Sequence, residues 1–417
     1  MHDAVVIGAG HNGLVAANVL ADAGWSVRVV EADEEPGGAV RSGELVEPGF
    51  VNDRFSAFYP LAAASPVFRA LRLEIPFRHG PLVLAHPAPD GTCAALRRDG
   101  GDERWQRIEP AILRGLVTPF PQVRAGLALA LDAGALSLLR RPRDPLAARI
   151  REGNALHADV PPWSLVGRFF GVVLAELGRR YGFPCVEGGA GRMTELLVAR
   201  ALARGVELRL GERVERVPSA RRAVVAAVDV WELARITGKR VRVRPDPATV
   251  KVDWTLDGPI PWSAEPARSA PVVHLGGEPD FVLFGQYSMA DPTRAPAGKE
   301  TAWAYSHVLG AEAIEAQVER HAPGFRALVR GRRVEHLPPG RINLGTARVR
   351  NELVLRPFHG RPETGIPGVY LGSASAHPGG AVHGAPGWIA AQAALRSASR
   401  RRARGVASLT ISSRYTT

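Results

Sequence analysis

The first thirty residues alternate between short apolar runs and one amphipathic segment. Residues 3–7 form a β-branched apolar run of strand type, and a second such run covers 26–31. Between them, apolar positions recur at helical spacing over 11–23. A strand, a helix and a strand within this length predict a βαβ unit with a parallel sheet.

Later segments repeat both periodicities. We expect helices over 192–204, 311–321 and 386–400, and buried strands over 206–217, 221–228 and 368–372. Residues 249–256 and 281–284 show the period-two alternation that is typical of antiparallel strands. The pattern predicts an α/β protein in which a discontinuous Rossmann-like domain carries an inserted α+β substrate domain, with an antiparallel sheet and helices.

Three glycines mark the first turn, between the predicted strand and helix. Gly8, Gly10 and Gly13 have the G-x-G-x-x-G spacing of a dinucleotide-binding turn. In that turn the first glycine bends the chain, the second lets the backbone approach a pyrophosphate, and the third lets helix and strand pack closely. Free N–H groups at the helix start would face the phosphates. Glu31 ends the second strand, where a carboxylate accepts hydrogen bonds from ribose hydroxyls.

The next residues indicate which dinucleotide is bound. Gly37-Gly38-x-x-Arg41-Ser42 resembles the FAD-binding start of the amine oxidase and phytoene desaturase superfamily, in which the glycine pair and the arginine approach the diphosphate. A guanidinium offers a planar donor fork suited to phosphate. The resemblance predicts FAD as the cofactor.

A second motif lies near the C-terminus, from Tyr370 to Ala385. It resembles the closing FAD motif of carotenoid desaturases, in which a His-Pro-Gly-Gly-like turn leads into a helix beneath the flavin. Glycines there let the backbone approach a flat ring, and the helix start favours the anionic reduced flavin. His377 and His383 either shape this loop or transfer protons. The predicted FAD contacts are Gly8, Gly10, His11, Asn12, Gly13, Glu31, Ala32, Gly37, Gly38, Arg41, Val214, Gly372, Ser373, Gly380, Val382 and Gly384.

Taken together, the chain is identified as a shortened member of the phytoene dehydrogenase-related NAD(P)/FAD-dependent oxidoreductases. Further similar segments are 55–60, 153–159, 250–254 and 303–305. The family implies a two-domain fold, with the adenine against the backbone near Val214. We expect an FAD-binding domain of residues 1–45, 182–235 and 341–400, a substrate domain of 46–181 and 236–340, and a basic flexible tail of 401–417.

The chain departs from that family at two places. Family members have a three-stranded meander between the strands expected at 206–217 and 221–228, but Pro218-Ser219-Ala220 alone remain here. A parallel crossover needs a dozen or more residues, so this connection is predicted to be strained unless the strands or the sheet are rearranged. Ser373 stands where many relatives have an acidic residue beside the ribityl chain.

Composition excludes several function classes. The net charge is +12, but the arginines are dispersed, which argues against nucleic-acid binding. Cys93 and Cys185 show no pairing pattern and no redox pair follows the first motif, which argues against a flavin disulfide reductase. Residues 126–139 are apolar but too short to span a bilayer. We expect a cytoplasmic protein without a metal site, in peripheral contact with a membrane at most.

The predicted activity is transfer of a hydride from an apolar substrate C–H to flavin N5, with oxygen or a quinone as the acceptor. Lys251 is a catalytic candidate, because a lysine near N5 recurs in amine oxidases; a solvent-facing strand position is the alternative. The aromatic residues expected to line an apolar pocket, or to fill the core, are Phe55, Phe58, Tyr59, Trp254 and Trp303. Two other functions stay open, a non-catalytic escort-type FAD-fold protein and a flavin amine oxidase.

Overall fold

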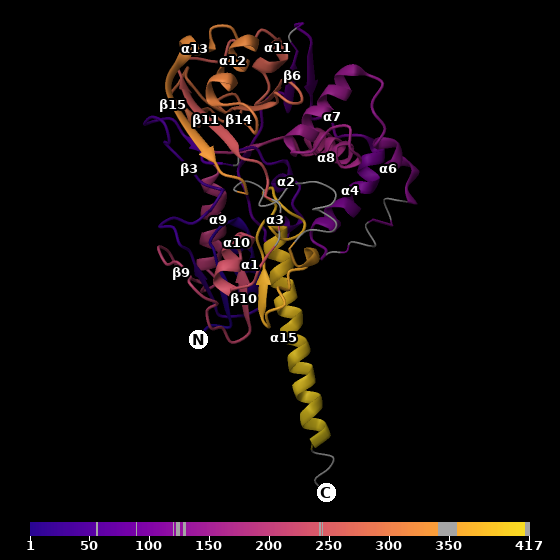
Figure 1. The fold of residues 1–417 in the computed structure, drawn as a ribbon, viewed down its shortest axis with the longest axis vertical. Coiled ribbons are helices and arrows are strands. Elements are labelled where there is room, and N and C mark those ends of the chain that lie inside the picture. Colours follow the sequence, from indigo (N-terminus) through magenta and orange to yellow (C-terminus); the bar gives the residue numbers. More distant parts are fainter. Residues whose placement is uncertain are drawn as a thin grey trace.

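A computed structural model gives the fold of the chain (Figure 1). It describes residues 1–412 except 56, 89, 120, 122–125, 128–130, 242, 244 and 341–356. For residues 133, 357, 359 and 402–412 it describes the backbone alone.

The first sheet is parallel and has five strands. Its order is β16-β10-β1-β2-β9, and each neighbouring pair runs in the same direction. The strands are β1 (Ala4–Ile7), β2 (Val27–Val30), β9 (Glu207–Arg209), β10 (Ala223–Ala226) and β16 (Val369–Leu371). All five come from the segments expected to form the FAD-binding domain.

Helices cover both faces of this sheet. On one face α1 (His11–Asp22), α9 (Gly191–Leu202) and α15 (Ala385–Ser412) enclose a core that includes Val6. On the other face α10 (Val230–Thr237) packs over Ile7. Successive β1 side chains therefore enter opposite cores, as the period-two geometry of a strand requires.

The connection expected to be strained has enough length. β9 ends at Arg209 rather than 217, so residues 210–222 remain to reach β10. Three strand spacings are about 14 Å, whereas this segment extended reaches roughly 40 Å. Val214, Val217 and Ala220 pack on the face of Ile7 and Leu371, beside α10. The prediction of a strand to 217 was wrong because Glu31 and Asp33 take the segment's backbone bonds beyond β9.

The second sheet is larger and mostly antiparallel. Its order is β15-β11-β14-β13-β12-β6-β7, with one parallel pair, β12 with β6. The strands are β6 (Leu84–Pro87), β7 (Cys93–Leu96), β11 (Thr249–Leu256), β12 (Val272–Leu275), β13 (Val282–Gln286), β14 (Glu300–Ser306) and β15 (Val329–Leu337). The expected strand at 249–256 is therefore confirmed at both ends.

The two faces of the second sheet differ in chemistry. Val252, Trp254 and Leu256 point into a core closed by α12 (Ala311–His321) and α13 (Phe325–Leu328). The alternate residues Lys251 and Asp253 lie on the opposite, inner face. Near this face lie the helices α4 (Glu103–Leu116), α6 (Ala133–Leu138), α7 (Pro145–His157) and α8 (Leu165–Tyr181), at the right of Figure 1.

Short elements complete the chain. They are β3 (Ser42–Gly43), β4 (Asn52–Asp53), β5 (Phe77–Arg78), β8 (Cys185–Val186), α2 (Pro60–Ala63), α3 (Pro66–Ala70), α11 (Glu265–Arg268), and the 3-10 turns Pro292–Arg294 and Pro357–Gly360.

The C-terminal helix is longer than expected. α15 continues to Ser412, and its second half projects away from the body of the molecule (Figure 1). The prediction of a helix end at 400 was wrong, because alanine and arginine favour a helix and no proline interrupts it before 412. Residues 413–417 of the predicted tail lie outside the described residues.

Candidate functional site

The first turn has the geometry of a phosphate cradle. A Cβ at Gly13 would overlap the carbonyl oxygen of Gly8 and lie 3.0 Å from the Cβ of Ala227, so helix and strand pack directly on each other. A Cβ at Gly10 would meet no atom within 4 Å. Gly10 precedes the first residue of α1, where backbone N–H groups have no partner within the helix. Open space therefore lies where the motif predicts the pyrophosphate.

Two buried polar atoms at this helix start have no partner within the described residues. They are Nε2 of His11 and Oδ1 of Asn12. Burial, with the nearby His383, lowers the pKa of His11 to about 3, so its ring is neutral. Uncompensated buried polar atoms are costly and mark a place where a polar ligand binds. These residues fit FAD at this position.

The glycine pair closes the other side of the turn. The amide of Gly37 donates to the carbonyl of Ala9 at 2.9 Å, and Gly37 pairs with Gly10 in a parallel bridge. Gly37 has a φ of 118°, and a Cβ there would lie 2.7 Å from the carbonyl oxygen of Val40. Only glycine fits this backbone without strain.

The acid that follows β2 is held in a fixed position. Glu31 accepts from the amide of Ala9 at 2.6 Å and from that of Asp33 at 3.0 Å. Arg41 donates to the carboxylate of Asp33 at 2.7 Å and to the carbonyl of Gly38 at 3.0 Å. Both side chains therefore lie beside the glycine turn. Ala32, between them in sequence, is exposed.

The crossing segment passes the same acid. The amide of Glu212 donates to the carbonyl of Glu31 at 2.8 Å, and the carbonyl of Val214 accepts from Arg235 at 2.6 Å. This brings Val214 close to the end of β2, where the adenine contact was expected.

The C-terminal loop meets the start of α1. A Cβ at Gly384 would lie 2.9 Å from a methyl of Val15, and His11 bonds to the backbone of Ala381. Gly372, Ser373 and Val382 are buried and Gly380 is half-buried. The structure thus joins the two cofactor motifs, which are separated by more than 300 residues in sequence.

The two histidines of this loop are both buried. Nδ1 of His383 accepts from the amide of Ala385 at 3.1 Å, at the first residue of α15, and Nε2 lies 3.1 Å from the carbonyl oxygen of Gly380. His383 therefore orders the loop and the helix start. His377 is buried in the same loop.

Lys251 is buried and paired, so the solvent-facing alternative was wrong. Its ammonium bonds to the carboxylate of Asp253 and, at 3.2 Å, to the carbonyl of Asp53. Burial raises the pKa of Asp253, against the lowering effect of Lys251. The residue after Asp53, Arg54, donates its amide to the carbonyl of Arg41 at 2.8 Å. The backbone of residues 53 and 54 therefore connects the ammonium of Lys251 to Arg41 of the cofactor motif.

Sequence reasoning missed the residue that joins these parts. Asp53 accepts from Arg294 at 2.7 Å and from the amide of Ala190 at 2.8 Å, and all three residues are buried. Arg294 also bonds Asp291 at 3.1 Å. Asp53 ends the two-residue strand β4, and Arg294 ends a 3-10 turn far away in sequence. A lone acid or arginine in so short an element carries no sequence pattern.

The structure separates the five aromatic candidates. Phe58 stacks on Tyr287, with ring centroids 5.6 Å apart, and lies 6.2 Å from Trp303. Tyr59 is buried in the core of the first sheet, and Phe55 lies against its neighbour Arg54. Trp254 points to the outer face of the second sheet, where its indole N–H donates to Glu315 at 3.0 Å. Trp254 and Trp303 cannot line one pocket because they lie on opposite faces.

Among the residues that the structure describes, no group of three or more metal-ligating side chains converges. Nor does any described helix have the length and apolar character to cross a membrane.

Comparison with known proteins agrees with this geometry. Residues 3–139 match the family model "FAD dependent oxidoreductase". The chain is 26% identical to a phytoene dehydrogenase of Streptomyces griseus, over 65% of this chain and 60% of that one. It is 24% identical to a pyridine nucleotide-disulfide oxidoreductase domain-containing protein of Rattus norvegicus, over 95% of this chain and 93% of the relative.

Solved structures share the fold at low sequence identity. An oxidoreductase from Methanosarcina mazei has a TM-score of 0.62 at 15% identity, covering 94% of this chain and 99% of its own. Cyclohexylamine oxidase from Brevibacterium oxydans has a TM-score of 0.57 at 16% identity, covering 95% and 98%. The predicted fold class is therefore confirmed. The family model over residues 3–139 supports the predicted cofactor, FAD.

Proposed function

We propose that this chain, an FAD-dependent oxidoreductase of the amine oxidase and phytoene dehydrogenase superfamily, oxidises an apolar substrate at an activated C–H bond. The proposal includes an electron acceptor such as oxygen or a quinone. The observation that carries it is that aromatic rings and a buried ammonium group share the inner face of the second sheet. There the aromatic rings of Phe58, Tyr287 and Trp303 pack together. The buried Lys251 lies on the same face of the sheet, one strand away from Trp303 and two positions along.

When bound, FAD supplies the hydride acceptor of this reaction. The chain's own contribution is binding, orientation and exclusion of water. Rings of Phe58 and Trp303 offer apolar area to a substrate and keep the site dry. Trp303 stacks on Tyr305, with centroids 6.0 Å apart, so the aromatic lining is held in place by its own strand.

Lys251 is the proposed polar residue of this site. It lies opposite Tyr305 in the strand register and two residues from Asp253, which lies opposite Trp303. Its bond to the carbonyl of Asp53 fixes the ammonium towards the cofactor side of the sheet. A fixed cation at this place would orient an acceptor or a substrate dipole.

His377 and His383 are proposed to order the cofactor loop rather than to move protons. The hydrogen bonds of His383 to Gly380 and Ala385 support this assignment.

The test is anaerobic reduction of the FAD-loaded protein, followed by absorbance at the flavin bands. Polyenes, fatty-acid derivatives and amines are mixed separately with the enzyme. Bleaching by polyenes or fatty-acid derivatives is the expected result. Bleaching by amines alone, with peroxide on aeration, would identify an amine oxidase instead. A colourless protein that FAD does not reconstitute would favour the escort-type alternative and overturn the proposal.

A substitution links the activity to the aromatic lining. Trp303→Leu is expected to slow bleaching at least ten-fold while flavin content stays unchanged. The matched control is Trp254→Leu, on the opposite face, which lowers stability but leaves the bleaching rate per bound flavin within two-fold. Equal effects of both substitutions on that rate would contradict the assignment.

A further inference from the structure

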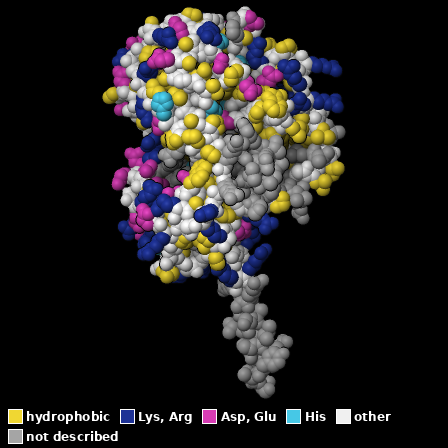
Figure 2. Space-filling view, in the orientation of Figure 1, with side chains coloured by type: hydrophobic (Ala, Val, Ile, Leu, Met, Phe, Trp, Pro, Cys, Tyr) yellow, Lys and Arg dark blue, Asp and Glu magenta, His cyan; other side chains and the backbone are white. Residues whose placement is uncertain are grey.

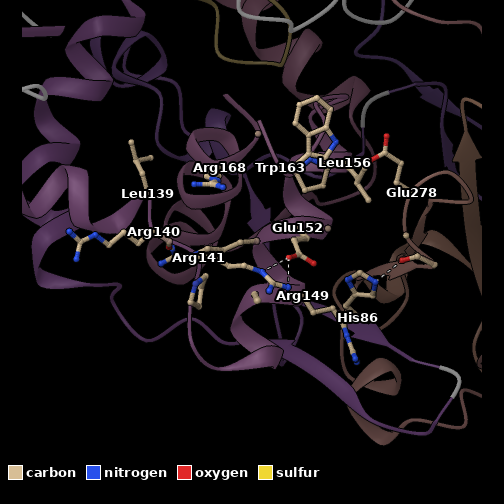
Figure 3. A pocket seen from close by; sticks show the side chains of 18 residues that line it. His86, Leu139, Arg140, Arg141, Arg149, Glu152, Leu156, Trp163, Arg168 and Glu278 are labelled. Carbon is tan, nitrogen blue, oxygen red and sulfur yellow. Dashed lines mark hydrogen bonds and ion pairs between the residues drawn. The ribbon is translucent and has the colours of Figure 1, made fainter. Parts of the chain in front are cut away.

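A pocket of about 570 Å³ opens among the helices at the far end of the second sheet (Figure 3). It is lined by α7, the start of α8, the turn after α6 and the loop 276–278. His86 on β6 lies at its edge, in a cross-strand row that leads through His274 to Lys251. Four strand spacings separate His86 from Lys251, or about 19 Å. The pocket is therefore distinct from the site proposed above.

Positive charge dominates the pocket. Its lining contains five arginines against two glutamates: Arg140, Arg141, Arg149, Arg151, Arg168, Glu152 and Glu278. Arg141 neutralises Glu152 at 3.0 Å, as the dashed line in Figure 3 marks. Arg151 is tied to the carbonyls of Leu138 and Arg140 at 2.7 and 3.1 Å. Within the described residues, the guanidinium groups of Arg140 and Arg168 have no acidic partner.

The same pocket has an apolar rim. Leu139, Leu156 and Trp163 line it, and Trp163 is 72% exposed. Leu165, two residues further, is 67% exposed. Figure 2 shows hydrophobic side chains gathered over this helical part of the molecule, with basic side chains projecting beside them. Large apolar side chains exposed beside unpaired cations are typical of a binding surface rather than of a solvated one.

We propose that this pocket binds an anionic amphiphile, with a phosphate or carboxylate head group on Arg140 and Arg168 and the apolar body against Trp163. Guanidinium groups suit both head groups, since their planar fork matches two oxygens. Indole offers the apolar body a large rigid contact. The proposal does not depend on the proposed oxidation, because it concerns separate residues and a binding event.

The test is calorimetric titration of the FAD-loaded protein with dodecyl phosphate below its micellar concentration. We expect dodecyl phosphate to bind at least ten-fold more tightly than inorganic phosphate, and dodecanol not to bind. Arg140→Gln/Arg168→Gln should weaken the binding of dodecyl phosphate at least ten-fold, because both charge-assisted contacts with the head group are lost. Trp163→Ala should weaken the binding of dodecyl phosphate but leave the affinity for inorganic phosphate unchanged.

A matched control removes the same charge elsewhere. Arg216→Gln/Arg326→Gln removes two exposed arginines from other surfaces. It should leave the Kd for dodecyl phosphate within two-fold of the parental value. Equal losses in both double variants would overturn the proposal in favour of a diffuse charge effect. Equal affinity for inorganic and dodecyl phosphate would also overturn it.

Vesicles distinguish the source of the amphiphile. Phosphatidylglycerol-containing vesicles are compared with pure phosphatidylcholine vesicles in a flotation assay. Arginine-dependent binding to the anionic vesicles, displaced by dodecyl phosphate, assigns the pocket to a lipid head group. Binding of dodecyl phosphate without vesicle binding assigns it to a free molecule. Binding of neither ligand refutes the proposal.

Discussion

Gly10 and Gly13 lie three residues apart at the start of α1, and a methyl group added at each has a different consequence. At Gly10 the methyl enters open space, and the backbone, with φ −64° and ψ 166°, is one that alanine adopts freely. At Gly13 it enters the carbonyl of Gly8 and the side chain of Ala227. Gly10→Ala is therefore expected to impair cofactor binding, and Gly13→Ala to impair folding.

The expected magnitudes follow from these contacts. Replacing Gly10 at a helix N-cap costs about 0.5–1 kcal/mol, which the reduced freedom of the unfolded chain offsets by about 0.4–1 kcal/mol. The unfolding free energy then changes by less than about 0.5 kcal/mol. The methyl of Gly13→Ala forces helix and strand apart, at about 1–3 kcal/mol for an overpacked core. For a chain of 417 residues that unfolds as one unit, a loss of about 2 kcal/mol lowers Tm by roughly 2 °C.

Two measurements separate the outcomes. Thermal unfolding of flavin-free protein gives the stability, and quenching of flavin fluorescence on titration gives the Kd for FAD. Gly10→Ala should keep the parental Tm and raise the Kd for FAD at least ten-fold. Retention of the parental Kd by Gly10→Ala would refute the reasoning, since the pyrophosphate would then not use the space before α1. An unchanged Tm in Gly13→Ala would refute the packing argument.

Three further predictions concern buried charges. Lys251→Met leaves the buried carboxylate of Asp253 without its hydrogen-bonded cation, with Arg333 at 3.7 Å as the remaining positive charge. It should lower the free energy of unfolding in urea by about 3 kcal/mol, and Lys251→Met/Asp253→Asn should recover most of that loss. Burial lowers the pKa of His274 well below its ordinary value, so the unfolded chain takes up a proton there below pH 6.5. His274→Leu should therefore flatten the loss of stability between pH 6.5 and 4.5, and an unchanged slope would contradict this. For His307, burial alone would lower the pKa, but Asp159 raises it. Asp159→Asn should thus cost about 1 kcal/mol below pH 6.5 and progressively less as pH rises through the raised value.

Sequence patterns predicted the parts of the site that local geometry dictates. The motif of Gly8, Gly10 and Gly13 can be recognised from the sequence, because a strand, a turn and a helix start follow one another within a few residues. Family resemblance predicted that both motifs bind the cofactor, but the contact of His11 with the loop at Ala381 was not predicted. Contacts over such separations have no local periodicity.

The rest of the site depends on tertiary packing. Lys251 alternates with apolar residues, which is consistent with a solvent-facing or a buried polar position, and only the contact with Asp53 decides between them. The end of β9 was misjudged for a similar reason. Residues 210–217 are compatible with a strand, but the chain turns towards Glu31 and Asp33 and leaves the sheet.

Asp53 has a consequence for how the chain can be divided. Its two carboxylate oxygens and its carbonyl hold Ala190, Arg294 and Lys251, which belong to three distant stretches of sequence. Excising the second sheet together with the turn at Arg294 would leave this buried carboxylate without its cation. Excising the first sheet together with α9 and its N-cap Ala190 would remove the other hydrogen-bond donor to the carboxylate. The two sheets are therefore expected to express, unfold and resist proteases as one unit. Chimeras with a relative's substrate part would need Asp53 and Arg294 transferred together.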